Sequence, residues 1–274
     1  MAKVAVLLAV YNAEKYLEEC LSSITGQTWQ DWELFACNDG SKDSSLSIME
    51  RYAVQDKRIH ILNNEKNIGI VATRNRLIGA IPADAEYAAW VDSDDICFPE
   101  RLQKQVEYLE KHPEIGAVGA ALEIIDENSN TTGCRHYPED PGEIRRQLPV
   151  TNVIAQPVLM LRSSVIKATG LYTFEYPVCE DYDYWLRVLE KFDFANIGEP
   201  LLRYRISTTQ CKQSRLKEML RLTLQIQKDH YRRTGQKMPL AGKLRQLAGK
   251  MLLLLPAKLI LKIFCLLTYK NAQK

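Results

Sequence analysis

Three acidic residues follow one apolar run at a spacing that suits the binding of a divalent cation. Asp92, Asp94 and Asp95 come directly after the run 88–91. Residues i and i+2 of an extended chain point to the same side, so Asp92 and Asp94 can converge on one point. Two carboxylates suit Mg²⁺ or Mn²⁺ and leave coordination sites for phosphate oxygens and water. The alternative is a solvated acidic turn or a helix cap ahead of Pro99.

Polar residues also follow two earlier apolar runs. Tyr11 and Asn12 end the first run, and Asp39 ends the second. The Asp39 carboxylate can accept hydrogen bonds from a nucleobase N–H or a ribose hydroxyl. The same stretch, 38–43, also predicts a turn with a helix cap, and one residue can cap while its neighbour binds.

Arg74 is the basic residue with the clearest potential for chemistry. It lies within Ala72-Thr73-Arg74-Asn75 on a predicted helix. Its planar fork of donors suits a phosphate or a planar base. The alternative is a surface ion pair with an acidic neighbour.

The elements that would position these residues alternate between strands and helices. Apolar runs predict strands, and apolar residues at helical spacing predict the helices between them. The predicted order is strand 3–10, helix 16–24, strand 32–37, helix 44–54, strand 58–62, helix 69–81 and strand 86–91. This order is typical of an α/β fold with a parallel sheet, where ligands bind at the carboxyl ends of the strands.

The remaining pattern completes one α/β domain and adds a tail. It predicts helix 100–111, strand 117–125, a loop over 133–150 with one short helix, an extended run 157–162, helix 181–191 and a last strand 201–206. We therefore expect an α/β domain over residues 1–210 and a helical, basic extension over residues 211–274.

The charges of the chain are divided between these two parts. The net charge is +2, but residues 212–274 carry 15 Lys and Arg against 2 Asp and Glu, which leaves 1–211 at −11. This division predicts chemistry in the body and an anionic partner for the tail. The seven cysteines are odd in number and lack CxxC spacing, which disfavours a zinc or disulfide framework and indicates a reducing cytoplasm.

The end of the tail predicts an amphipathic helix at a membrane surface. The stretches 251–257 and 263–269, its longest without charge, are shorter than the ~20 apolar residues that a spanning helix needs. Lys258 and Lys262 would share one face, opposite Leu259, Ile263 and Leu266, which suits peripheral attachment to the cytoplasmic face of a membrane. The alternative is a helix packed on the domain. Nucleic acid is not an expected partner, because no binding module is recognisable.

Taken together, the ordered motifs resemble the family 2 glycosyltransferases with the GT-A fold, over roughly residues 3–206. The motifs are Ala9-Val10-Tyr11-Asn12, Ser22-Ile24-Gln27-Thr28, Asn38-Asp39-Gly40-Ser41-Lys42-Asp43, Asn67-Ile68-Gly69, Ala72-Thr73-Arg74-Asn75, Asp92-Ser93-Asp94-Asp95, Glu180-Asp181-Tyr182-Asp183-Tyr184-Trp185-Leu186-Arg187 and Glu199-Pro200-Leu201-Leu202-Arg203-Tyr204-Arg205. The resemblance implies an inverting, metal-dependent enzyme that moves a sugar from a nucleotide-sugar, UDP-linked by expectation, to a saccharide or lipid-linked acceptor in bacterial surface polysaccharide assembly.

The resemblance also implies roles for single residues. Asp94 would be the main metal ligand, and Asp181 would be the catalytic base. The residues expected to bind the nucleotide-sugar are Ala9, Tyr11, Asp39, Arg74, Asp92 and Ser93, with Asp92 on the ribose or the metal. Carboxylates at 180, 181 and 183 would crowd together and so raise the pKa of the base. Without the resemblance, Glu180 and Asp181 predict only the capped first turn of a helix.

Three further residues are candidates for the acceptor site or for supporting contacts. Trp185 could stack on a sugar face or belong to the core. Arg187 could pair with the acidic cluster or contact the diphosphate. Many relatives carry a histidine after the last Tyr-Arg pair, but here Tyr204-Arg205 is followed by Ile206. This leaves Arg205 or a hydroxyl to take the place of the histidine.

Two other functions are compatible with part of this pattern. A sugar-nucleotidyltransferase would need a glycine-rich phosphate loop after the first strand, where this chain has Tyr11-Asn12-Ala13-Glu14. A catalytically inactive domain that binds membranes or partners would not need both Asp94 and Asp181.

Overall fold

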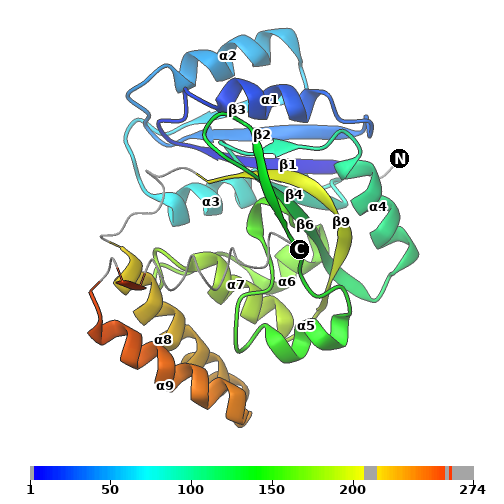
Figure 1. Cartoon of the computed structure of the whole chain (residues 1–274). Helices are drawn as coiled ribbons and strands as arrows, with labels where there is room; N and C mark the ends of the chain where they lie inside the picture. Colours follow the sequence, from blue (N-terminus) through cyan, green and yellow to red (C-terminus); the bar gives the residue numbers. More distant parts are fainter. Residues whose placement is uncertain (1–2, 207–214, 257–258, 261–274) are drawn as a thin grey trace.

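The apolar runs at the start of the chain form parallel strands separated by helices, as the pattern predicts. The structure is a computed structural model that describes residues 3–206, 215–256 and 259–260 (Figure 1). These first elements are β1 (Val4–Val10), α1 (Leu17–Thr25), β2 (Trp32–Asn38), α2 (Ser45–Gln55), β3 (Ile59–Asn63), α3 (Ile70–Gly79) and β4 (Tyr87–Asp92). Strand β1 pairs in parallel with β2 and β4, and β2 pairs in parallel with β3.

The second half of the described chain extends the same sheet with mixed pairing. Its elements are β5 (Ile96–Cys97), α4 (Arg101–Lys111), β6 (Ile115–Ile125), β7 (Thr131–Arg135), α5 (Pro141–Gln147), the 3₁₀ turn η1 (Gln156–Val158), β8 (Met160–Arg162), α6 (Ser163–Thr169), α7 (Glu180–Leu189) and β9 (Asp193–Arg205). The sheet order is β3-β2-β1-β4-β8-β6-β9-β5, with β7 beside β6. Strands β6 and β9 are parallel, whereas β8 is antiparallel to both β4 and β6. The predicted α/β fold class is confirmed.

The sheet is covered by helices on both faces, and β1 shows why. Its residues alternate, so Val6 and Leu8 enter one core while Ala5 and Leu7 enter the other. Helices α1, α2 and α4 pack on the first face, and α3, α5, α6 and α7 pack on the second. A strand buried on both faces reads as a continuous apolar run, which is what residues 4–10 provide.

The structure departs from the predicted elements where short or interrupted segments pair. Strand β9 begins at Asp193 rather than at 201, and shifts of register between β6 and β9 accommodate Pro200. Strand β7 occupies part of the predicted loop, because the turn after β6 is closed by Asp126, which accepts hydrogen bonds from the N–H groups of Asn128 and Asn130. Helix α6 and the two-residue β5 were not predicted, because neither is long enough to show periodicity.

Among the described residues after 214, two long helices lie at one end of the molecule. Helices α8 (Leu216–Thr234) and α9 (Leu240–Leu254) run beside each other, far from α1 and α2 (Figure 1). Ile226 of α8 is buried in the second core, and Gln227 donates to the Val150 carbonyl at 2.8 Å. Helix α8 thus packs on the α/β domain. The predicted lysine face at 258 and 262 lies outside the described residues.

Candidate active site at the carboxyl edge of the sheet

The register of the central strands brings the predicted site residues to one edge. Ala9 of β1 lies between Cys37 of β2 and Asp92 of β4 in the strand pairing. Neighbouring strands are about 4.8 Å apart. The residues that follow these strands, including Tyr11 and Asp39, therefore lie along one rim with Asp92. Ser93 continues the chain beyond Asp92, and both residues are partly exposed.

Asp39 clamps the rim to the loop that precedes α3. The side chain is buried, and it accepts hydrogen bonds from the Asn64 side chain at 2.9 Å, from the Ile68 N–H at 2.9 Å and from the Gly69 N–H at 3.0 Å. Gly40 has a φ of 65°, and a Cβ there would lie 2.5 Å from the backbone of this loop. Only glycine permits this approach. Asp39 thus organises this wall of the rim, and any nucleobase contact would be additional to these bonds.

The end of β1 presents an exposed aromatic ring beside this wall. Asn12 has a φ of 49°, and its N–H donates to Ser41 Oγ at 3.0 Å while its Oδ1 accepts from the Lys42 N–H at 2.8 Å. These bonds join the turn after β1 to the turn after β2. The Tyr11 side chain is left 49% exposed at the rim, where it can stack on a planar base.

The acidic turn after β4 has one exposed side and one buried side. The Asp92 side chain is 40% exposed, whereas Asp95 is fully buried and its Oδ1 accepts the Arg205 N–H at 2.9 Å. Burial, and secondly the charge of Asp92, raises the pKa of Asp94 to about 6. No group of three or more Asp, Glu, His or Cys side chains that could hold a metal occurs in the described part of the chain. A cation here would therefore rely on two carboxylates and on ligand oxygens.

Arg205 supports the acidic turn from behind. Its guanidinium is buried and donates to the carbonyls of Asp94 at 2.9 Å and Asp126 at 3.1 Å, to Ser129 Oγ at 3.0 Å and to Glu19 at 2.8 Å. These contacts use the donor groups of the fork. The structure thus places the Arg205 guanidinium under the acidic turn, where it bonds to the backbone of that turn; its predicted supporting role stays a prediction.

Arg74 connects the acidic turn with the first turn of α7. It is buried, forms an ion pair with Glu180 and lies 3.8 Å from Asp92. With its amide oxygen turned toward the guanidinium, Gln156 accepts from Arg74 Nε at 2.8 Å. Segments more than 80 residues apart in the sequence, around 92 and 180, thus meet at one guanidinium.

Two aromatic rings complete the surroundings of this arginine. The Arg74 guanidinium carbon lies 5.9 Å from the ring centre of Trp90 and 5.8 Å from that of Tyr172. Neither ring, nor Gln156, was singled out from the sequence. The Trp90 position was predictable as an inner residue of β4, whereas Gln156 lies in a 3₁₀ turn and Tyr172 in an irregular segment, and neither segment carries a pattern.

The carboxyls at the start of α7 have raised pKa values, but not chiefly for the predicted reason. Burial is the largest cause and raises the pKa of Glu180 to about 7, against the opposing charge of Arg74. Burial also raises the pKa of Asp181, again opposed by Arg74. Asp183 does not join this group, because it pairs with Arg187 at 2.9 Å on the other side of the helix. The expected crowding of three carboxylates is therefore wrong, and two share the site.

Trp185 and Arg187 lie behind the site rather than at its rim. Trp185 is 0% exposed and packs edge-on against Tyr184 and Phe194, with ring centres 5.3 and 6.3 Å away. Arg187 donates to Asp183 and to the Leu171 carbonyl at 2.9 Å. Of their predicted alternatives, the structure therefore favours the core for Trp185 and the acidic partner for Arg187.

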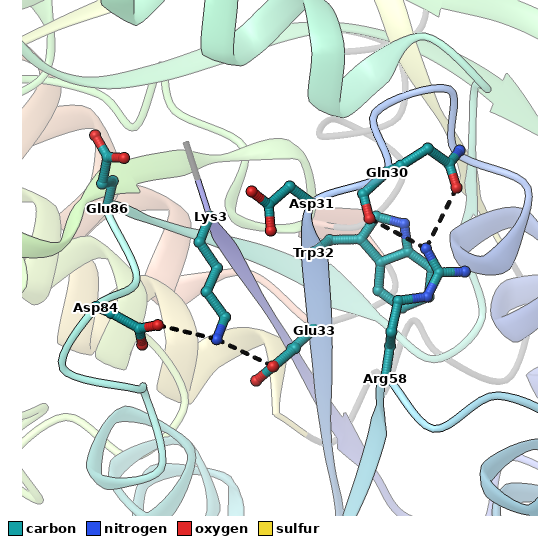
Figure 2. Close-up of a pocket in the computed structure, with 8 residues that line it drawn as sticks. All are labelled: Lys3, Gln30, Asp31, Trp32, Glu33, Arg58, Asp84 and Glu86. Carbon is teal, nitrogen blue, oxygen red and sulfur yellow. Dashed lines mark hydrogen bonds and ion pairs between the residues drawn. The ribbon is translucent and has the colours of Figure 1, made fainter. Parts of the chain in front are cut away.

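The cavity drawn in Figure 2 is separate from this rim. It measures about 410 Å³ and lies at the amino ends of β1, β2 and β4, the opposite edge of the sheet. Lys3 bridges Glu33 at 3.0 Å and Asp84 at 3.2 Å, and Arg58 lies over the Trp32 ring at 3.8 Å (Figure 2). Lys3 is thus paired within the cavity, and Arg58 is paired with the neighbouring Asp56 at 2.7 Å.

Comparison with solved structures gives the class of fold. The chain superposes on S. aureus TarS residues 1–349 in complex with UDP-GlcNAc with a TM-score of 0.63 and 20% identity, covering 82% of this chain and 66% of that one. It also superposes on the mannosyltransferase PcManGT from Pyrobaculum calidifontis, in complex with GDP-Man and Mn²⁺, with a TM-score of 0.58 and 16% identity over 99% of this chain and 76% of that one. The fold is of the GT-A type.

The sequence comparison then gives the family. Residues 5–170 match the family described as Glycosyl transferase family 2, and the chain belongs to this family. It is a glycosyltransferase, and the predicted resemblance is confirmed. None of the helices in the described ranges is both long and apolar enough to cross a membrane.

Three relatives illustrate the range of the family. An uncharacterized glycosyltransferase of Haemophilus influenzae is 35% identical over 76% of this chain and 66% of its own length, so this chain spans slightly less than two thirds of that relative. The O-antigen biosynthesis glycosyltransferase WbnJ of Escherichia coli is 30% identical over 78% of this chain and 83% of its own. The UDP-Glc:alpha-D-GlcNAc-diphosphoundecaprenol beta-1,3-glucosyltransferase WfgD of Escherichia coli is 28% identical over 80% and 83%.

Proposed function

We propose that this glycosyltransferase transfers one hexose, with inversion, from a UDP-sugar to a saccharide or lipid-linked acceptor in cell-surface polysaccharide synthesis. The observation that carries the proposal is Arg74, which joins Asp92 at the acidic turn to Glu180 beside Asp181. Inversion requires the donor diphosphate and the base to lie on opposite sides of one sugar carbon. Arg74 brings the acidic turn, where the diphosphate would bind, and the start of α7, which carries the base, to one rim. The names of WbnJ and WfgD support the setting.

Each residue has a distinct task in the proposed reaction. Tyr11 stacks on the uracil, and Asp39, Ala9 and Ser93 shape the wall that holds the nucleoside. Asp181 takes the proton of the acceptor hydroxyl while that oxygen bonds to the anomeric carbon and the bond from this carbon to the diphosphate breaks. A carboxyl with a raised pKa is a stronger base once ionised, which suits this step. UDP leaves with the bonding electrons.

Asp94 and Asp92 would hold Mn²⁺ or Mg²⁺, with Arg205 fixing the backbone of their turn. Two carboxylates are a suitable hard donor set, and the remaining ligands would be diphosphate oxygens and water. When bound, the cation supplies positive charge to the departing diphosphate. The complex of PcManGT with both GDP-Man and Mn²⁺ supports this assignment.

A donor screen tests the proposal directly. UDP-, GDP- and dTDP-sugars are incubated with the enzyme, Mn²⁺ and a mixture of saccharide and polyprenyl-diphosphate acceptors, and release of nucleoside diphosphate is measured. We expect release from UDP-sugars. Release of inorganic diphosphate during synthesis of a sugar nucleotide would instead indicate a nucleotidyltransferase, and neither turnover nor stabilisation by any nucleotide would indicate an inactive binding domain.

The role of the base is tested with one isosteric pair. Asp181→Asn removes the proton acceptor with little change of volume, and we expect it to abolish transfer while UDP still binds. Asp84→Asn is the matched control, because Asp84 is exposed at the opposite edge of the sheet. Loss of UDP binding together with transfer in Asp181→Asn would mean that Asp181 is structural.

Attachment to the inner face of the plasma membrane through the C-terminal basic region is part of the proposal. A lipid-linked acceptor would lie at such a surface. Deleting residues 240–274 should move the protein to the soluble fraction, and unchanged partitioning would contradict it.

A further inference from the structure

Helix α9 exposes its large apolar side chains and buries its small ones. Five side chains on one face are between 57% and 84% exposed, and we call them the leucine stripe: Leu240, Leu244, Leu247, Met251 and Leu254. Their spacing of four and three residues keeps them on one side of the helix. A helix packed on a domain normally shows the opposite arrangement, so this face lacks a partner within the described residues.

The opposite face of α9 explains why the stripe cannot turn inward. Gly242, Gln246 and Gly249 are buried. A Cβ on Gly249 would lie 2.8 Å from a methyl group of Leu224 on α8, so even one added methyl group would displace the Leu224 side chain. The Gln246 amide donates to the Leu224 carbonyl at 2.9 Å and to Gln227 at 2.8 Å. Rotating α9 to bury the leucines would break these bonds and force large side chains against α8.

The charge around the stripe selects among partners. Lys243 and Lys250, seven residues apart and both exposed, run along one edge of the stripe. No Asp or Glu occurs after Asp229 in the whole sequence. A second copy of α9 would therefore place like charges together, whereas an anionic lipid surface complements them.

We propose that the leucine stripe of α9 is the membrane-docking face, with its apolar side chains in the acyl boundary of an anionic bilayer and Lys243 and Lys250 at the headgroups. This deepens the proposed function, on which it rests for the identity of the membrane-bound acceptor. Hydrogen bonds connect α9 to the helix that carries Asp181: Gln246 donates to Gln227, and Gln227 donates to the Tyr182 hydroxyl at 3.3 Å in the first turn of α7. Docking through α9 thus orients Asp181 relative to the lipid surface.

The test uses the full chain and sedimentation with vesicles of zwitterionic lipid, with or without anionic lipid. Leu244→Glu/Leu247→Glu should weaken binding to anionic vesicles about tenfold or more. Val54→Glu is the matched control, since Val54 is an exposed apolar residue on α2 at the other end of the molecule. Lys243→Glu/Lys250→Glu should weaken binding at least about fivefold for each charge, and only with anionic lipid.

A second measurement does not depend on the glutamate variants. Leu247→Trp should show tryptophan quenching by brominated lipid beyond that of the unaltered protein, which places the stripe in the acyl region. Unchanged binding of Leu244→Glu/Leu247→Glu, or no added quenching, would overturn the proposal. So would a dimer in solution that Leu244→Glu/Leu247→Glu dissociates, because the stripe would then bind a second copy. So would vesicle binding that the full chain lacks and that appears only when residues 257–274 are deleted, because the stripe would then bind the chain's own end.

The outcome is separable from that of the proposed function. The double variants Leu244→Glu/Leu247→Glu and Lys243→Glu/Lys250→Glu should both retain UDP binding and transfer to a water-soluble acceptor. If the donor screen fails while vesicle binding follows the stripe, only the reaction assignment is wrong. If transfer is found and the stripe substitutions leave vesicle binding unchanged, only the assignment of the docking face is wrong.

Discussion

Arg205→Met should destabilise the enzyme and loosen its acidic turn in the same variant. Methionine keeps most of the aliphatic stem but removes the buried guanidinium that donates to the carbonyls of Asp94 and Asp126. Each hydrogen bond to a charged group contributes about 1.5–3 kcal/mol. Loss of the ion pair with Glu19 adds little to the destabilisation, because the Glu19 side chain is 48% exposed and stays solvated without its partner. The expected loss is therefore about 3–5 kcal/mol, as for other broken buried charge contacts.

The assay combines thermal unfolding with titration of UDP in the presence of Mn²⁺. At about 2–4 °C per kcal/mol for a chain of this size, Tm should fall by roughly 10 °C. UDP affinity should fall about tenfold or more, which is typical when a residue supporting a metal ligand is lost. Arg203→Met is the matched control: it lies on the same strand, but its side chain is 45% exposed and pairs with Glu123 at the surface. Equal Tm values for the two variants would refute the reasoning.

Further predictions concern pH, the nucleoside and the C-terminal helices. Transfer should rise with pH through neutrality and then level off, because Glu180 has a pKa of about 7 and Asp181 has a raised pKa, so both ionise later than ordinary carboxyls; a rate profile that is flat from mildly acid to mildly alkaline pH would contradict this. Tyr11→Ala should weaken UDP binding about tenfold, consistent with a lost base-stacking contact of about 1–2 kcal/mol, and calorimetry should show no change for Tyr11→Phe. Gly249→Leu should displace α9 and increase its amide hydrogen exchange, because the added side chain meets Leu224; unchanged protection of α9 would show that the glycine contact does not matter.

The central strands and the edge where ligands bind could be predicted from sequence because their signals are local. The run 4–10 is apolar at every position because its alternate residues face two cores. Such a run has few other interpretations than a buried parallel strand. Once parallel order is assumed, the ends of β1, β2 and β4 must share one edge. The sequence alone therefore predicts that Tyr11, Asp39 and Asp92 lie along the same edge.

The rest of the site could not be predicted, because it depends on contacts between distant segments. Nothing in the sequence says that Asp183 turns toward Arg187 while Glu180 turns toward Arg74, since both acids occupy one helical turn. Gln156 approaches Arg74 from a 3₁₀ turn that has no periodic pattern. Likewise, the apolar spacing of α9 left open whether its leucines face a membrane surface or the domain, and only the structure shows them exposed, with Gly242 and Gly249 buried on the other face.

The charges at the rim make donor binding depend on the divalent cation. Asp92, Glu180 and Asp181 all act on Arg74, and Arg74 is already paired with Glu180, so one guanidinium cannot also neutralise a diphosphate. A diphosphate approaching this rim without a cation would meet net negative charge in a poorly solvated site. Burial and Asp92 raise the pKa of Asp94 to about 6, so a proton and a cation compete for its carboxylate just below neutral pH. Donor binding should therefore require the divalent cation and should release protons, increasingly so as the pH is lowered toward 6.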